Sequence, residues 1–129
     1  MPDEPDAPQR GDVGADMATR LRRGVVGVLG IETVQIGPRR VELRLVVDER
    51  VHQPHGLLHG GVSALLAETA ASFGAEVAAP PGHHVVGIEL NVSHLRPMRR
   101  GVLTAVGAPV RVGRSVQVWE VSLTDDAGR

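Results

Sequence analysis

One segment restricts the possible folds of this chain more than any other. Residues 57–79, LLHGGVSALLAETAASFGAEVAA, are almost all apolar or small, and Pro80-Pro81-Gly82 follow directly. The run contains no proline and ends where prolines begin, so it predicts one long helix over residues 60–79. A helix with so little polar surface requires cover from the rest of the chain.

The flanking segments read as strands. Residues 30–38 and 39–48 alternate apolar and polar side chains, and Gly37-Pro38 separates them like a hairpin turn. Three further extended runs follow the long helix, at 83–97, 101–113 and 114–125, and a short helix is predicted at 15–25. This order predicts an α+β fold in which an antiparallel sheet wraps one long central helix. We expect a disordered tail over residues 1–13 and a single domain over residues 14–129.

Composition removes several classes of function. The chain has no cysteine, which excludes disulfides, thiol nucleophiles and cysteine-bound zinc. Its net charge of -1 argues against a general nucleic-acid binder. All 14 basic residues are arginine, so any bound phosphate is held by guanidinium groups or backbone amides. No apolar run is long enough to span a membrane and the acidic start does not resemble a signal peptide, so we expect a cytoplasmic protein.

The helical periodicity separates two faces of the long helix. One stripe, which we expect to face the sheet, holds Val62, Leu65, Leu66, Thr69 and Phe73. The second holds Gly61, Glu68, Ser72 and Ala75. Glu68 has small apolar neighbours and no arginine three or four residues away. It is therefore either an ordinary solvated helix residue or a carboxylate that acts as an acid or base.

Two glycines open the long helix. The first N–H groups of a helix lack partners, so the Gly61 amide could donate to a ligand oxygen; a simple glycine-rich connection is the alternative. Gly61 and Glu68 are about 10 Å apart along one helix axis. One carbonyl group cannot contact both, because reacting atoms approach to about 3–3.5 Å. If both act on one substrate, they come from two copies of the chain in a dimer.

Three motifs carry a resemblance to a known family. QPHGLLHGGVSALLAETAASFGA, VVGIELNVSHLRPMRRG and VGRSVQVWEVSLTDDAGR resemble the hotdog-fold acyl-CoA thioesterases over residues 20–129. The nearest branch holds the phenylacetate-pathway (PaaI-like) and 1,4-dihydroxy-2-naphthoyl-CoA thioesterases. The resemblance implies homodimers or homotetramers with active sites between subunits. It also implies hydrolysis of an acyl-CoA, with an aryl or hydroxyaryl acyl group favoured, and no cofactor beyond the coenzyme A of the substrate.

The resemblance also implies roles for individual residues. The glutamate at Glu68 attacks the thioester carbonyl or activates water, and the Gly61 amide polarises that carbonyl. Gln53 and His59 orient the thioester, and Ser72 places the water or the acyl ring. The residues implied along the substrate and its coenzyme A are Gly60, His94, Arg96, Arg111, Gly113, Arg114 and Ser115.

Some features leave alternatives open. The family has a final strand after its D-x-x-G-R turn, whereas this sequence stops at Arg129, so we expect unpaired sheet edges. A non-catalytic acyl-CoA-binding module is the alternative function. His52, His55 and His59 suggest a metal site, but their loop contains a proline and no acid is clearly placed as a further ligand, so no metal is predicted.

Overall fold

The computed structural model describes residues 19–20 and 22–129. The elements are, in chain order, α2 (Gly24–Leu29), β1 (Glu32–Ile36), β2 (Val41–Val47), the short 3-10 helix η1 (Glu49–Val51), α3 (Gly60–Ala78), β3 (Gly101–Val112) and β4 (Gln117–Thr124). The tail predicted at 1–13 lies outside the described residues, as do residues 15–18 and 21 of the helix predicted at 15–25. The helix seen there, α2, begins at Gly24 and ends at Leu29, and its C-cap is Gly30, whose φ of 67° lies in the left-handed region that glycine favours.

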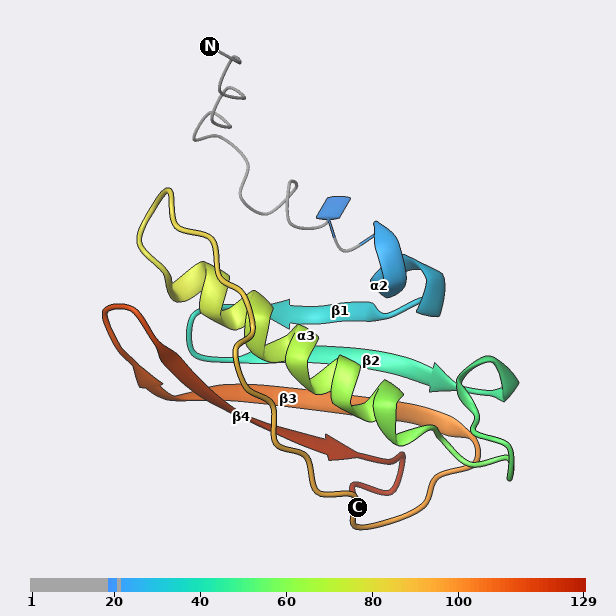
Figure 1. The fold of residues 1–129 in the computed structure, drawn as a ribbon. Helices are drawn as coiled ribbons and strands as arrows, with labels where there is room; N and C mark the ends of the chain where they lie inside the picture. Colours follow the sequence, from blue (N-terminus) through green and yellow to red (C-terminus); the bar gives the residue numbers. More distant parts are fainter. Residues whose placement is uncertain (1–18, 21) are drawn as a thin grey trace.

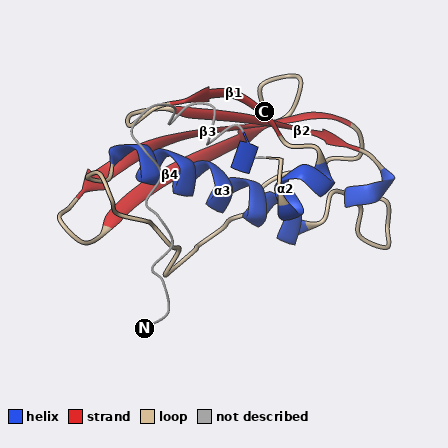
Figure 2. Cartoon of the chain, turned by 90° about the horizontal axis from the view of Figure 1, so that it is seen from above, coloured by secondary structure: helices blue, strands red, loops and turns tan. Residues whose placement is uncertain are grey.

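The described residues form two layers. Strands β1 to β4 make an antiparallel four-stranded sheet in the order β1-β2-β3-β4, as Figure 1 shows. Helix α3 lies across one face of the sheet (Figure 2). The predicted α+β architecture, the long helix and the β1–β2 hairpin are therefore confirmed, and so are the strands predicted at 101–113 and 114–125.

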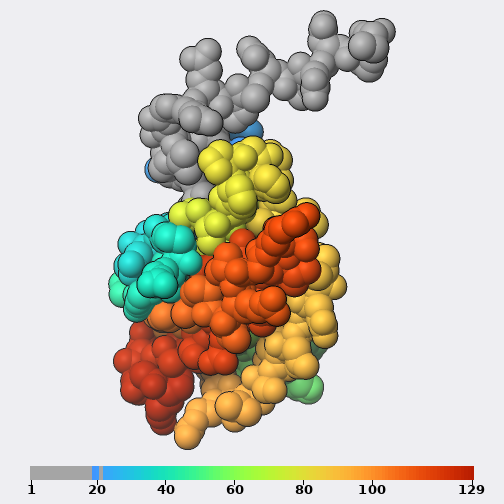
Figure 3. All heavy atoms as spheres, turned by 90° about the vertical axis from the view of Figure 1, so that its left-hand side faces the viewer, coloured from blue at the N-terminus to red at the C-terminus, as the bar shows by residue number. Residues whose placement is uncertain are grey.

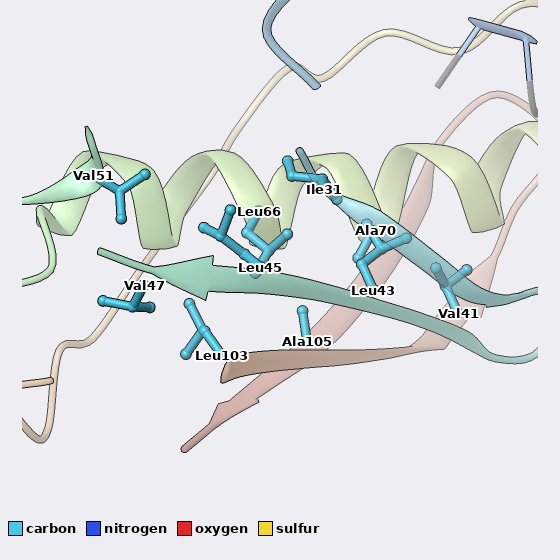
Figure 4. Close-up of a cluster of buried hydrophobic side chains, with 10 residues drawn as sticks. All are labelled: Ile31, Val41, Leu43, Leu45, Val47, Val51, Leu66, Ala70, Leu103 and Ala105. Atoms are coloured by element: carbon cyan, nitrogen blue, oxygen red, sulfur yellow. The ribbon is translucent and has the colours of Figure 1, made fainter. Parts of the chain in front are cut away.

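The core lies between the sheet and α3. Strand β2 alternates regularly, with Val41, Leu43, Leu45 and Val47 facing inward. Figure 4 shows the complete cluster, which consists of Ile31, Val41, Leu43, Leu45, Val47, Val51, Leu66, Ala70, Leu103 and Ala105. Because β2 is a central strand with one face on the helix, its period-2 pattern fixes which side of the sheet is buried.

The sheet-facing stripe predicted for α3 is confirmed in part. Leu66 belongs to the core, and Val62, Leu65 and Phe73 pack partly buried against it. The buried helix residues are Leu66, Ala67, Ala70, Gly74 and Ala75, so Leu66 alone belongs to both sets. Small residues are buried here because the helix sits close to the sheet. The Trp119 ring of β4 fills the space beside Gly74, and Gly107 of β3 lies near Ala70. Ala75 was predicted on the second stripe. That prediction is wrong, because Ala75 is also buried where the helix lies close to the sheet.

The prediction of a strand at 83–97 is also wrong. Residues 83–97 carry no strand, and within the described part of the chain the backbone of residues 84–97 has no hydrogen-bond partner. Val86 and Ile88 are 82% and 80% exposed, so the segment lies on the surface. An extended segment becomes a strand only beside another strand, and no strand of the sheet pairs with this one. The space-filling view shows it as an amber strip down one side of the molecule (Figure 3).

The sheet ends at β4, which pairs with β3 on one side and with no described strand on the other. After β4, the Asp125 carboxylate accepts hydrogen bonds from the Ala127 and Arg129 N–H groups, at 2.9 and 3.0 Å. Among the residues the structure describes, no helix is long and apolar enough to cross a membrane.

Candidate functional site

A cavity of about 480 Å³ opens along the side of α3 that faces away from the sheet. Gly61, Glu68 and Ser72 lie along it from one stripe of the helix, as their spacing predicts. Its apolar wall includes Val26 of α2, Leu65 and Phe73 of α3, and Leu90 of the 83–97 segment. Leu65 and Phe73, expected to face the sheet, thus also line the cavity, while their other surface packs against the core.

The Glu68 carboxylate has no ion-pair or hydrogen-bond partner among the described residues. Its side chain is exposed on the cavity side of α3. The backbone of Gly87, in the 83–97 segment, lies directly against it. An unpaired carboxylate in a mainly apolar cavity is free to attack an electrophile or to take a proton from water.

The start of α3 is built around His59. His59 is the N-cap residue, and its Nδ1 accepts a hydrogen bond of 2.8 Å from the Gly61 N–H. The Gly61 amide, predicted to polarise the carbonyl, is therefore occupied in the absence of substrate. The N–H of Gly60 has no acceptor among the described residues, so it is the open donor at this helix end.

His94 lies at the same helix end. A Cβ on Gly60 would lie 2.9 Å from His94 Nε2, so the imidazole packs directly on the Gly60 backbone. A side chain at position 60 would push the His94 ring away from the helix end. The structure thereby brings together His59, Gly60, Gly61 and His94, which were predicted as separate candidates.

Gln53 is oriented by its own loop. Its Oε1 accepts from the N–H of His55 and, at 3.5 Å, from that of Leu57. Because the oxygen is engaged, the Nε2 group is the end of the side chain that remains available as a donor. A donor suits the predicted role of orienting a thioester carbonyl.

The other substrate candidates are not gathered in one copy of the chain. Arg96 is exposed in the 83–97 segment. Arg111 lies at the end of β3, and Gly113, Arg114 and Ser115 form the β3–β4 turn. Figure 1 shows this hairpin end at the opposite end of α3 from Gly60. Gln117, at the base of this turn, donates to the Ala75 carbonyl near the C-terminus of the helix, at 3.0 Å.

Two of the three loop histidines, His52 and His59, have local partners. His52 Nε2 lies 2.6 Å from the Arg99 carbonyl oxygen, and His59 caps α3. Within residues 19–20 and 22–129, no three histidine or acidic side chains are placed to hold a metal ion together.

Sequence reasoning missed three neighbours of the site: Val26, Gly87 and Leu90. They lie 42, 19 and 22 positions from Glu68 in the sequence. No periodicity connects residues that far apart, so only the folded arrangement reveals them.

A long helix laid on an antiparallel sheet, with a free carboxylate and an open helix N-terminus on its outer side, is the arrangement of a hotdog-fold hydrolase. Residues 55–129 match the family model of the Thioesterase superfamily. The chain belongs to that superfamily, and the family resemblance and the enzyme class, thioesterase, are both confirmed.

The chain is similar to two curated relatives and to two solved structures. It is 44% identical to a 1,4-dihydroxy-2-naphthoyl-CoA hydrolase of Listeria monocytogenes, over 80% of this chain and 84% of that protein. It is also 44% identical to the proofreading thioesterase EntH of Cronobacter turicensis, over 78% and 74%. A thioesterase structure from Haemophilus influenzae matches with a TM-score of 0.84 and 37% identity, over 89% and 80%. The PaaI protein of E. coli shares the fold, with a TM-score of 0.78 over 88% and 81% at 19% identity.

Proposed function

We propose that the protein hydrolyses an acyl-CoA thioester to the free acid and coenzyme A, with Glu68 as nucleophile or general base. The observation that carries this proposal is the unpaired Glu68 carboxylate on an apolar cavity. A thioester has a good leaving group, so attack assisted by a carboxylate and an amide that polarises the carbonyl supply the chemistry needed. The enzyme then needs no cofactor, and the cytoplasm, where acyl-CoAs are made, is the proposed location.

The helix N-terminus is proposed to hold the thioester oxygen. Gly61 can do so if the substrate displaces His59, whereas the Gly60 N–H is open without any rearrangement. Gln53 Nε2 supplies a second donor from the neighbouring loop. Two donors on one oxygen stabilise the negative charge that develops there as the carbonyl is attacked.

The acyl group is proposed to be aryl or hydroxyaryl. Leu65, Phe73 and Leu90 give the cavity apolar walls, and its volume of about 480 Å³ lies within the range of small-molecule sites. Ser72 offers one hydroxyl without a partner among the described residues, suited to a water or a ring hydroxyl. The name of the Listeria relative, a naphthoyl-CoA hydrolase, supports the same class.

The complete site is proposed to form between two copies of the chain. Gly61 and Glu68 are too far apart along one helix for a single carbonyl, by the distance of about 10 Å given above. Glu68 is exposed on one copy, and the β3–β4 arginines lie far from Gly60. A second copy packed against this face of α3 would bring Glu68 to the other helix N-terminus and cover the cavity.

Complementation tests the shared site. Glu68→Gln and Gln53→Ala are each expected to be nearly inactive alone. If they exchange subunits freely, half of the dimers are mixed and each mixed dimer holds one intact site, so about a quarter of the wild-type activity returns. A mixture no more active than its parts, from proteins shown to exchange, contradicts the shared site.

Thiol release from a panel of acyl-CoAs tests the activity itself. The chain has no cysteine, so a thiol-reactive dye detects coenzyme A without background. We expect turnover, fastest with aryl or hydroxyaryl substrates. A folded protein that binds coenzyme A but releases none from any substrate would instead support the non-catalytic acyl-CoA-binding module.

A further inference from the structure

The Glu68 carboxylate is held against one residue of the 83–97 segment. A Cβ built on Gly87 would lie 3.2 Å from the Glu68 Cδ and 3.7 Å from its Cγ, and closer still to Oε1. The space that a side chain at position 87 would occupy is therefore the space that the carboxylate fills. The segment passes along the cavity side of α3, since Leu90 lines the same cavity and His94 reaches Gly60.

Little else in the described residues fixes this carboxylate. Glu68 has no ion pair or hydrogen bond there. Its helix neighbours four residues away are Ala64 and Ser72, which are too small to restrict a glutamate, and Leu65, three residues before it, offers only apolar contact. A glutamate with rotatable side-chain bonds and no polar partner takes its direction from steric contacts.

We propose that Gly87 is a positioning residue for Glu68, because its missing side chain leaves the room from which the carboxylate reaches the thioester. The inference rests on the proposed function of Glu68. Gly87 does not have a positive φ, so its backbone accepts alanine without strain. The group that must move to admit the alanine Cβ is the Glu68 carboxylate, at the far end of a flexible side chain. Alanine therefore costs little stability but turns the carboxylate away from the reacting carbon.

The test compares Gly87→Ala with Gly37→Ala. A Cβ at Gly37 meets only the Arg40 carbonyl oxygen, at 3.5 Å, in the β1–β2 turn, so this variant measures the effect of a glycine replacement away from the site. For Gly87→Ala we expect kcat to fall at least tenfold while KM and the melting temperature stay close to wild type. The 13Cδ NMR signal of Glu68 is expected to shift in Gly87→Ala and not in Gly37→Ala.

A double variant separates positioning from a general effect. Aspartate at position 68 is one methylene shorter, so its carboxylate oxygens lie about where the glutamate Cδ is, 3.2 Å from the Cβ of an alanine at 87. They touch that Cβ without the overlap that the glutamate Oε1 has. Glu68→Asp combined with Gly87→Ala is therefore expected to be as active as Glu68→Asp alone. Additive losses, a large drop in melting temperature, or an unshifted 13Cδ signal with wild-type kcat would each overturn the proposal. Failure of the proposed function is seen separately, as full activity in Glu68→Gln.

Discussion

At the residue scale, the Gly61 N–H at the N-terminus of α3 has two possible acceptors, the His59 side chain and the expected substrate. The Gly61 N–H donates to His59 Nδ1 at 2.8 Å, which satisfies one of the unpaired donors of the helix. The same N–H was expected to bind the thioester oxygen. Either the substrate displaces the imidazole or the neighbouring Gly60 amide takes that role, since Gly60 is open in this structure.

Removing the cap tests this arrangement. His59→Ala is expected to lower the free energy of unfolding by about 1 kcal/mol, because the Gly61 donor loses its acceptor. Urea unfolding followed by circular dichroism measures the change. His55→Ala is the matched control, since the His55 side chain is exposed in the same loop and has no bonded partner in the described residues. Equal stability of the two variants would mean that the cap contributes nothing.

At the scale of elements, α3 approaches the sheet through its smallest residues. Gly74 lies under Trp119, with an ideal Cβ 2.9 Å from the ring Cζ2 and nearer to other ring atoms. The ring is not free to move, because Trp119 Nε1–H donates to Gln117 Oε1 at 2.9 Å. Gln117 in turn donates to the Ala75 carbonyl. The close packing of helix and strand thus depends on a missing side chain.

Gly74→Ala is therefore expected to destabilise the protein, although alanine favours helix more than glycine does. Overpacking costs about 1–3 kcal/mol, which exceeds the gain in helix propensity of up to about 1 kcal/mol. Unfolding can be followed through the fluorescence of Trp119, the one tryptophan of the chain. Gly37→Ala again serves as the control, and a Gly74→Ala protein more stable than wild type would contradict this packing.

The hydrogen bonds in the turn after β4 predict how the protonation of Asp125 depends on pH. The backbone N–H of Arg129, followed by that of Ala127, lowers the pKa of Asp125 below its ordinary value. A carboxyl with a depressed folded pKa contributes stability above its unfolded pKa, and this contribution disappears as the pH falls through the folded pKa. An NMR titration of Asp125 should give a midpoint below about 3.9, the usual aspartate value. A midpoint at or above that value would show that the turn does not form in solution.

The sequence predicts elements well where a pattern is local. The alternation in β2 and the proline stop after α3 lead to the observed strand and helix within a residue or two. The strand predicted at 83–97 does not form, because alternation shows only that a segment can be a strand, whereas pairing depends on what lies beside it. The sheet-facing stripe of α3 is incomplete, because hydrophobicity points to large side chains and misses the buried glycine and alanines that the close contact at Trp119 requires.

At the scale of the whole molecule, the sheet covers one side of α3 and leaves the other side to the site (Figure 2). The placement of Glu68 and Gly61 on one stripe along the cavity was predictable, because both lie on one helix at a regular spacing. The contacts of Gly87 with Glu68 and of His94 with Gly60 were not, since they join positions that only the folded chain brings together. Under the proposed function, assembly of two copies is the remaining step from this half-open cavity to a complete site.

The central claim is that the Glu68 carboxylate performs the hydrolysis. The most direct measurement is kcat for thiol release by Glu68→Gln beside wild type, on whichever acyl-CoA the parent hydrolyses fastest. Circular dichroism and melting temperature establish that the variant is folded. The account predicts a fall in kcat of about 100-fold or more, because glutamine has the same shape but neither attacks nor accepts a proton. A folded Glu68→Gln protein that hydrolyses the substrate as fast as wild type would contradict it.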